Sequence, residues 1–284
     1  MKLPFNLDLQ GKVVVVTGGG GVLCGMFARA LGQCGAKIAV LDLRREAAQK
    51  VADDICQNGG TAKGYAANVL KPDELKACRE EIMKDFGACD ILINGAGGNH
   101  PKGTTAKEYL EEADLADNQE LITFFDLDPD GIEFVFNLNF LGTLLPTQVF
   151  AKDMAKAKAG TIINISSMNA FCPLTKIPAY SGAKAAVSNF TQWLAVHFSK
   201  MGVRVNAIAP GFFVTDQNRG LLFDENGHPT PRTEKILAAT PMGRFGEAEE
   251  LVGTLLWLVN EQASGFVNGV VVPVDGGFSA YSGV

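Results

Sequence analysis

A serine pair, a single tyrosine and a lysine lie close together in the stretch NISSMNAFCPLTKIPAYSGAKAAV, residues 164–187. If residues 179–200 are helical, Tyr180 and Lys184 lie on one face, one turn apart. A phenol with a pKa of about 10 is a weak base, and a neighbouring ammonium group favours the phenolate. The pair therefore predicts general acid–base chemistry at neutral pH. Because such a pair is common by chance, the rest of the chain has to support it.

Short β-branched segments alternate with longer helical patterns along the whole chain. Strands are expected at 12–17, 37–42, 61–66, 90–93, 160–166, 203–209 and 270–274, and helices near 22–34, 44–57, 73–86, 131–157, 179–200 and 247–260. Runs such as VVVV and TIINI are apolar on both faces, which is typical of a parallel sheet covered by helices on both sides. The pattern predicts one α/β domain over residues 1–284, a doubly wound Rossmann-type fold with a parallel, seven-stranded sheet.

Two long polar segments, 98–130 and 212–240, interrupt this alternation after expected strand ends. Ligands of doubly wound folds bind at the carboxyl ends of the strands, and long loops in compact domains often carry function. We therefore expect both segments to border the substrate. The acidic stretch EYLEEADLADNQE in the first segment is compatible with a short helix that caps the pocket or extends a subunit contact.

A glycine-rich stretch, TGGGGVLCG at 17–25, follows the first expected strand and precedes a helix. This arrangement is typical of a loop that places a pyrophosphate on free N–H groups at the helix start. Asp42 ends the second strand about 20 residues further on, where a carboxylate can accept hydrogen bonds from an adenosine ribose. It favours NAD over NADP, a preference that Arg44 and Arg45 would soften. The alternative role for Asp42 is a helix N-cap.

Composition narrows the class of protein. The net charge is -6, the pI is about 5.2, and Lys and Arg are scattered, so nothing indicates nucleic acid or an anionic membrane as a partner. The six cysteines show no metal-binding spacing and are interpreted as small buried residues in a reducing compartment. The spacing of cysteine and histidine predicts no bound metal. No signal peptide and no run of 18 apolar residues is found, which predicts a cytoplasmic protein.

Taken together, these motifs resemble the short-chain dehydrogenase/reductase family over nearly the whole chain. The later motifs occur in order: NGAG at 94–97, Asn139-x-x-Gly142, Ser167 placed 13 residues before Tyr180, Tyr180-x-x-x-Lys184, Pro210-Gly211 and VDGGFS at 274–279. One feature departs from the family. Its glycine loop, T-G-x-x-x-G-x-G, would require glycines at Val22 and Cys24, so the pyrophosphate contact is expected to be displaced.

The resemblance implies catalytic roles for four residues. Tyr180 would exchange the hydroxyl proton while hydride moves to or from nicotinamide, and Lys184 would lower its pKa and hold the nicotinamide ribose. Ser167 would hydrogen-bond the reacting oxygen, with Ser166 as the other candidate. Asn139 would hold a water that relays protons from Lys184, or it would satisfy backbone groups at a helix distortion.

The resemblance also implies a cofactor-binding set. Asn68, followed by Val69, occupies the place of an Asp that lies beside adenine, Asn94 mainly stabilises the strand crossing, and Thr215 would contact the nicotinamide carboxamide. The full set is Gly18, Gly20, Gly21, Val22, Leu23, Asp42, Asn68, Val69, Asn94, Ala96, Gly97, Tyr180, Lys184, Pro210, Gly211, Phe213 and Thr215.

Within the family, GGGGVLCG, NGAGGNHP, SSMNAF and GFFVTDQNR are similar to the short-chain type of fructuronate reductase, also called D-mannonate oxidoreductase. This resemblance implies a sugar-acid substrate, and a sugar acid needs a cation plus amides and an imidazole. The expected substrate-binding residues are Asn99, His100, Ser167, Asn169, Gln217, Asn218 and Arg219, with Arg219 or Lys102 as ligand of the carboxylate.

Three alternatives follow from the sequence. Another reductase of the family would act on gluconate-type polyols or on 3-oxoacyl thioesters, although no basic patch for an acyl carrier protein is evident. A dinucleotide-binding sensor without catalysis is the remote alternative, because a binder needs no activated phenol. Family resemblance further implies a homodimer or homotetramer, paired through the helices within 131–157 and 179–200 and through the C-terminal strand.

Overall fold

The computed structural model describes residues 7–116, 121–214 and 219–283. Its parallel sheet has the strand order β3-β2-β1-β4-β5-β6-β7. The strands are β1 Val13–Thr17, β2 Lys37–Asp42, β3 Thr61–Ala66, β4 Ile91–Asn94, β5 Gly160–Ile165, β6 Val203–Pro210 and β7 Val271–Val274. The predicted single-domain fold and seven-stranded sheet are confirmed. The strand order reverses between β1 and β4, which places the ligand crevice at their carboxyl ends.

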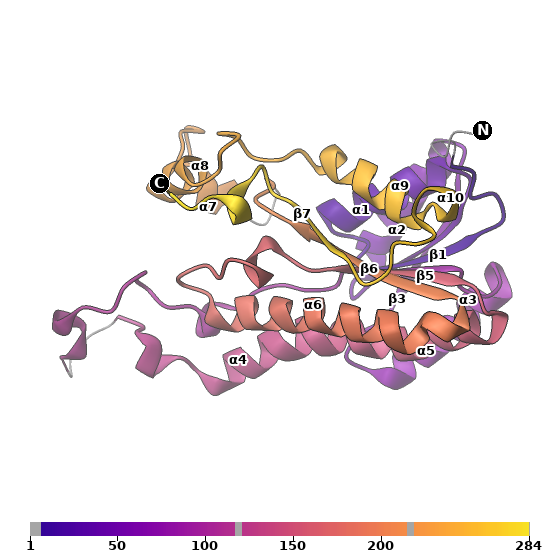
Figure 1. The fold of residues 1–284 in the computed structure, drawn as a ribbon, viewed down its shortest axis with the longest axis horizontal. Helices are drawn as coiled ribbons and strands as arrows, with labels where there is room; N and C mark the ends of the chain where they lie inside the picture. Colours follow the sequence, from indigo (N-terminus) through magenta and orange to yellow (C-terminus); the bar gives the residue numbers. More distant parts are fainter. Residues whose placement is uncertain (1–6, 117–120, 215–218, 284) are drawn as a thin grey trace.

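Helices cover both faces of the sheet. Figure 1 shows α1, α2, α9 and α10 on one side and α5 and α6 on the other, and α3 packs with these two in the second core. The bounds are α1 Val22–Gln33, α2 Arg45–Gln57, α3 Pro72–Asp85, α4 Pro129–Phe136, α5 Gly142–Ala157, α6 Pro178–Phe198, α7 Arg219–Leu222, α8 Pro231–Ala238, α9 Val252–Val259 and α10 Glu261–Ser264.

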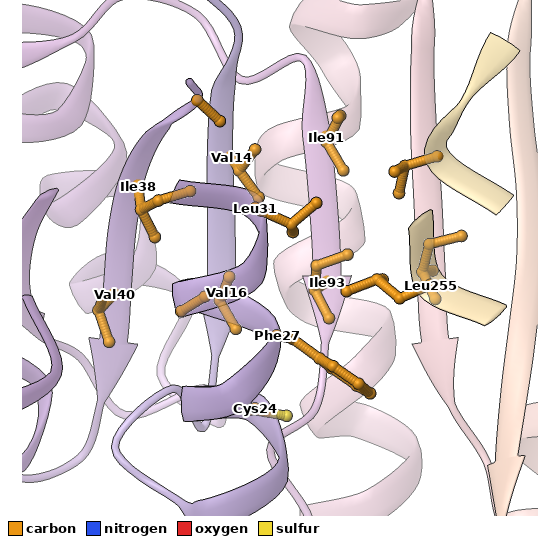
Figure 2. Close-up of a cluster of buried hydrophobic side chains, with 14 of the residues drawn as sticks. Val14, Val16, Cys24, Phe27, Leu31, Ile38, Val40, Ile91, Ile93 and Leu255 are labelled. Atoms are coloured by element: carbon orange, nitrogen blue, oxygen red, sulfur yellow. The ribbon is translucent and has the colours of Figure 1, made fainter. Parts of the chain in front are cut away.

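The alternation of side chains along β1 explains the two-sided core. Val14 and Val16 face the layer of α1 and α9, whereas Val13 and Val15 face the layer of α3, α5 and α6. Figure 2 shows Phe27 of α1 packed on the first of these surfaces. Because both faces are closed, the strand ends form a rigid platform for the residues that follow them.

The helix expected over 131–157 is interrupted in the structure. Between α4 and α5, Asn137–Leu141 form a π-helical turn, a distortion that inserts one extra residue and often occurs at functional sites. Pro129–Ala157, taken as one continuous helical stretch, has the length and hydropathy of a membrane span. However, Phe150 and Met154 lie in the core, so we assign the stretch to the interior of the domain.

The segment 98–128 extends away from the sheet (Figure 1). Its described residues form the short 3-10 turns Pro101–Gly103, Glu112–Leu115 and Phe124–Asp126, so the helix expected in the acidic stretch is reduced to one turn. Its large apolar side chains are exposed, namely Tyr109, Leu110, Leu115, Ile122, Phe124 and Phe125. Glu108 binds Lys235 of α8 at 2.9 Å, so the two long polar segments contact each other.

The cysteines are free thiols, as predicted. They differ in burial, because Cys24, Cys78 and Cys89 are buried while Cys34 and Cys172 are half-buried. The interpretation of all six as buried residues is wrong for Cys56, which is exposed at the end of α2.

Candidate active site

A buried network of side chains holds β4 and β5 together just below the crevice. Asn94 Nδ2 donates to Asn164 Oδ1 and to Thr147 Oγ1, both at 2.9 Å, and Asn164 Nδ2 donates to Thr191 Oγ1 at 2.9 Å. Buried polar groups need such partners, and these link the two strands to α5 and α6. The Asn94 side chain therefore stabilises the strand crossing, and any contact between it and a cofactor stays a prediction.

The glycine loop leads directly into α1, which begins at Val22 with Gly21 as a cap that offers no side chain. The N–H groups of the first helical turn, including those of Val22 and Leu23, therefore point outward without helical acceptors. Gly20 lies so close to the start of α2 that an added Cβ would approach Ala47 Cβ to 2.7 Å. The free N–H groups and the compact glycine loop are compatible with an anion at the start of α1, and the expected displacement of the pyrophosphate contact stays a prediction.

Asp42 connects this loop to the end of β2. Its Oδ2 accepts from the Gly20 N–H at 3.1 Å, and its Oδ1 accepts from the Arg44 N–H at 3.1 Å. The N-cap of α2 is Arg44, so the alternative role of Asp42 as that N-cap is wrong. The carboxylate is half-buried beside the glycine loop, and its contact with a ribose stays a prediction.

The remaining cofactor candidates before the insert lie at two strand ends. Asn68 follows β3 and its Oδ1 accepts from the Leu70 N–H at 2.9 Å, while Val69 is buried. Ala96 and Gly97 follow β4, and the Ala96 N–H donates to Thr17 Oγ1 at 3.3 Å. Gly97 is exposed, and only a residue without Cβ fits there, because a Cβ would lie 2.6 Å from Asn139 Oδ1.

Tyr180 and Lys184 occupy the first two turns of α6, as predicted. Lys184 Nζ donates to the Ile165 carbonyl at 2.8 Å and lies 5.6 Å from the centre of the Tyr180 ring. Ser167 caps the short turn after β5, where its Oγ accepts from the Asn169 N–H at 3.3 Å. The end of β5 and the start of α6 thus bring the predicted hydroxyl, phenol and ammonium groups together.

The structure separates the two candidate serines. Ser166 Oγ donates to the Lys184 carbonyl at 3.2 Å and lies 2.7 Å from Ser188 Oγ, so it is used inside the α6 interface. Ser167 instead forms a side-chain hydrogen bond with Tyr180, which lowers the pKa of the phenol. The geometry favours Ser167 as the group that binds a reacting oxygen.

Asn139 lies within the π-helical turn and is fully buried. Its Nδ2 donates to the carbonyls of Gly98 at 2.7 Å and Val135 at 2.8 Å, and its Oδ1 accepts from the Gly98 N–H at 3.2 Å. The side chain thus satisfies backbone groups at a helix distortion, which was the alternative expectation. A water held beside it for proton relay stays a prediction.

Burial sets the proton affinities of the catalytic pair. It lowers the pKa of Lys184 to about 8, so the ammonium form still dominates at neutral pH. The surrounding protein raises the pKa of Tyr180 to about 12, and the Ser167 hydroxyl opposes this rise. Burial dominates here and Ser167 is the group that opposes it, so the expected lowering of the Tyr180 pKa by Lys184 stays a prediction.

The loop after β6 supplies the last cofactor candidates. Pro210 ends β6, and the Gly211 N–H donates to the Val274 carbonyl at 2.9 Å. Phe213 is buried in the core on the α1 and α9 side, so only its backbone is available to a ligand. Thr215 lies outside the described residues.

The substrate-binding candidates are less concentrated. Asn99 Nδ2 donates to Thr104 Oγ1 at 3.0 Å, and His100 Nδ1 accepts from the Lys102 N–H at 3.2 Å. Asn169 is buried next to Ser167, and its Oδ1 has no partner among the described residues. Arg219 is exposed at the start of α7, whereas Gln217 and Asn218 lie outside the described residues.

The two candidate ligands of a carboxylate differ in their surroundings. Lys102 Nζ binds Asp128 Oδ2 at 2.7 Å, and this carboxylate raises the pKa of Lys102. No ion pair is described for Arg219 within the part of the chain that the structure covers. A new anion would have to displace Asp128 from Lys102, so the geometry favours Arg219.

Two features were missed from the sequence. Thr17 Oγ1 anchors the turn after β4, since it also accepts from the Gly95 N–H at 3.1 Å. Cys24 packs against Gly95 under the same turn. The signal for the second feature was present in the sequence, because Cys24 was already recognised as a departure from the glycine pattern.

Comparison with known proteins gives relatives along the whole chain. A crystal structure from Haemophilus influenza, with bound NAD and provisionally named a D-mannonate oxidoreductase, is 64% identical, with 100% of both chains covered and a TM-score of 0.93. An uncharacterised oxidoreductase of Bacillus subtilis, UxuB, is 53% identical over 99% of this chain and 100% of the relative. A gluconate 5-dehydrogenase from Burkholderia cenocepacia, in complex with NADP and tartrate, is 28% identical, covers 98% of this chain and 99% of its own, and has a TM-score of 0.82.

A family model described as short chain dehydrogenase matches residues 12–226. The match runs from β1 past α7, and so includes the glycine loop, Asp42, Ser167 and the Tyr180–Lys184 pair. The chain therefore belongs to the short-chain dehydrogenase family, oxidoreductases that act on CH–OH groups with a nicotinamide cofactor.

Proposed function

We propose that the protein is an NAD-dependent oxidoreductase that interconverts D-mannonate and D-fructuronate. The observation that carries this proposal is the likeness over the full chain, at 64% identity, to the NAD-bound structure provisionally named a D-mannonate oxidoreductase. The group of Ser167, Tyr180 and Lys184 supports the reaction type. The breakdown of hexuronates is the process in which this reaction would serve.

A dinucleotide fits the described residues. The open first turn of α1 suits a pyrophosphate, and Gly97 is exposed at the end of β4. Gly18, Gly20, Gly21, Val22 and Leu23 would hold the pyrophosphate, Asn68 and Val69 the adenine side, and Asn94, Ala96, Gly97, Pro210, Gly211, Phe213 and Thr215 the nicotinamide side.

Asp42 supports NAD over NADP. A ribose 2'-hydroxyl can donate to its carboxylate, whereas a 2'-phosphate there would meet a like charge. Arg44 and Arg45 are exposed next to it and would partly offset this repulsion. The gluconate 5-dehydrogenase solved with NADP shows that relatives with the same fold differ in this respect.

The chain's own residues then handle the proton. When bound, the nicotinamide supplies or accepts a hydride at its C4 atom. In the reducing direction the Tyr180 hydroxyl, which burial keeps protonated, donates its proton to the carbonyl oxygen of the substrate. Ser167 Oγ donates a hydrogen bond to the same oxygen, and the Lys184 ammonium stabilises the phenolate left behind. In the oxidising direction each transfer is reversed.

The sugar acid would be held by groups around the mouth of the site. Asn99, His100, Asn169, Gln217 and Asn218 would bind its hydroxyls, and Arg219 would pair with its carboxylate. Support comes from the buried position of Asn169 beside Ser167 and from the absence of a described ion pair on Arg219.

A gluconate-type polyol is the second candidate substrate. It is favoured by the 28%-identical gluconate 5-dehydrogenase, whose structure contains tartrate, a dicarboxylic sugar acid. The chemistry at Tyr180 would be the same, and only the groups bound at the loops would differ.

The deciding experiment is a comparison of substrates with the purified protein. NADH oxidation, followed by absorbance, should be fast with D-fructuronate and slow with 5-keto-D-gluconate, and NADPH should be a poor replacement for NADH. Preference for 5-keto-D-gluconate would keep the reaction and replace the substrate. Tight NADH binding without turnover of any carbonyl would instead indicate the dinucleotide-binding sensor.

We also propose a cytoplasmic homodimer or homotetramer paired through α5 and α6. The exposed face of α6 supports this, since Trp193 is 55% exposed and Val196 77% exposed although both are large and apolar. Size measurement in solution tests the assembly.

A further inference from the structure

Cys24, in the first turns of α1, is in close contact with Gly95, the first residue of the turn after β4. The Sγ atom of Cys24 lies directly against the Cα atom of Gly95, and a Cβ added to Gly95 would overlap with this sulfur. The same Cβ would be 3.5 Å from Cys24 Cβ, an ordinary van der Waals distance. The Thr17 carbonyl oxygen would lie 3.1 Å from the added Cβ, a tight contact that a small shift relieves, so the sulfur atom is the main obstacle to a side chain at position 95.

The turn that begins at Gly95 leads to the catalytic lysine. Its first two N–H groups, from Gly95 and Ala96, donate to Thr17 Oγ1. At its end, a Cβ on Gly97 would lie 3.2 Å from Lys184 Nζ. A displacement of this turn would therefore change the space around the Lys184 ammonium.

Cys24 is suited to fill space and not to react. It is buried in the core, and burial raises the pKa of its thiol to about 12, so it stays neutral. In the glycine pattern that the chain otherwise resembles, this position has no side chain at all. Here the side chain of Cys24 is accommodated because Gly95 has no side chain.

We propose that Cys24 and Gly95 form a matched pair that sets the distance between the cofactor-binding end of α1 and the turn packed on Lys184. Cys24 is thus a positioning residue for the hydride transfer, acting through residues 95–97. The proposal rests on the nicotinamide-dependent activity of the family, and it does not depend on which sugar acid is the substrate.

A double-mutant cycle tests the pair, with NADH binding and turnover as readouts. Gly95→Ala should lower kcat/KM for NADH roughly 30-fold or more, because the turn must move away from the sulfur. Cys24→Ala removes the sulfur and should cost only about 5-fold. The double variant should recover at least about tenfold over Gly95→Ala, because the new methyl group occupies the space that the sulfur leaves.

The pH profile of kcat distinguishes positioning from a general loss of stability. We expect the profile to shift in Gly95→Ala and to return in the double variant, because the surroundings of Lys184 change and are restored. Cys78→Ala, which removes a buried thiol far along the chain in α3, should lower the melting temperature without moving the profile.

Several outcomes would overturn the pair. These are native kinetics in Gly95→Ala, a double variant no better than Gly95→Ala, or an unchanged pH profile throughout. If Gly95→Ala does not fold, the double variant is compared with Cys24→Ala, and a double variant that is less active than Cys24→Ala contradicts the proposal. NADH binding is measured without any sugar, so a weaker affinity in Gly95→Ala that the double variant restores supports the pair even if the substrate assignment is wrong, and unchanged affinity in all three variants contradicts it.

Discussion

The cofactor side and the substrate side of the crevice are held in different ways. At the ends of β1, β2 and β4, Thr17, Asp42 and Asn94 bind backbone groups of the adjacent loops or a buried side chain of α5. In the described part of the segment 98–128, by contrast, the side-chain contacts include surface ion pairs such as Lys102–Asp128. The large apolar side chains of this segment, among them Phe125, face solvent.

This difference assigns catalysis to the rigid part of the site and substrate recognition to the exposed loops. Buried hydrogen bonds in a close-packed sheet hold the catalytic groups within narrow limits, which hydride transfer requires. Exposed ion pairs contribute little to stability and exchange partners readily. A site built in this way can keep one reaction while its loops accept different sugar acids, as the likeness to a gluconate 5-dehydrogenase illustrates.

The largest effect should come from the rigid side, on replacing the catalytic phenol. Tyr180→Phe should lower turnover by about 10³-fold, within the range for loss of a general acid, while NADH affinity stays within about twofold. Steady-state kinetics and NADH fluorescence titration measure the two quantities.

Tyr65→Phe is the matched control for this substitution. Tyr65 is also buried, but its hydroxyl donates to Asp85 at the far end of α3, so its loss should lower the melting temperature and leave turnover unchanged. Intact turnover in Tyr180→Phe would contradict the mechanism.

A second test concerns the nucleotide preference at the end of β2. Asp42→Asn should weaken NADH binding about tenfold and improve NADPH binding, because it removes a charged acceptor for the ribose and a repulsive charge at once. Kd values for both nucleotides measure the change. Asp53→Asn, an exposed carboxylate in α2, should alter neither value. An unchanged NADH/NADPH ratio in Asp42→Asn would remove the argument for NAD.

The fold and the rigid side of the site were predictable from the sequence because their signals are local. Strands such as Val13–Thr17 and Lys37–Asp42 are largely apolar or β-branched segments bounded by turns, and the spacing of Ser167, Tyr180 and Lys184 is fixed by one strand end and one helix. The π-helical turn at Asn137–Leu141 was not predicted, because one inserted residue hardly alters an apolar helical pattern. Its cause is distant in sequence, since Asn139 turns to bind the Gly98 backbone.

The sequence predicted the structure of the substrate side less well. Acidic residues in EYLEEADLADNQE suggested a helix, yet the described part forms only the turn Glu112–Leu115. Helices of this length are marginally stable without tertiary packing, and the large apolar side chains of this segment are exposed instead of packed on a core. The effect of burial, which raises the pKa of Tyr180, was also not predicted, because the depth of burial around a side chain is a property of the whole fold.

A third test compares two cations on the substrate side. Arg219→Ala should raise the KM for D-fructuronate about tenfold, because it removes a cation that can pair with the carboxylate. Lys102→Ala is the matched variant and should change KM less than about threefold, since Lys102 is already paired with Asp128. Steady-state kinetics at constant ionic strength distinguish them. A larger effect for Lys102→Ala would place the carboxylate at the insert instead of α7.

The smallest expected effect is a pH-dependent gain in stability from Lys184. Burial lowers the pKa of this lysine from 10.5 to about 8. Between these values the unfolded state binds more protons than the folded state, so the free energy of unfolding rises with pH. Relative to Lys184→Met, the native protein should therefore gain roughly a few degrees in melting temperature between pH 8 and pH 10.

Taking the difference between native protein and Lys184→Met removes an opposing contribution. Burial raises the pKa of Cys78 and Cys89, so stability falls above their ordinary pKa of 9, but Lys184 does not influence either thiol and this loss occurs in both proteins. Lys200→Met, a variant of an exposed lysine after α6, should run parallel to the native protein over the same range. If the melting temperatures of Lys184→Met also run parallel to those of the native protein, solvent reaches the Lys184 ammonium group in the native protein. The rigid side would then be more open than its packing indicates.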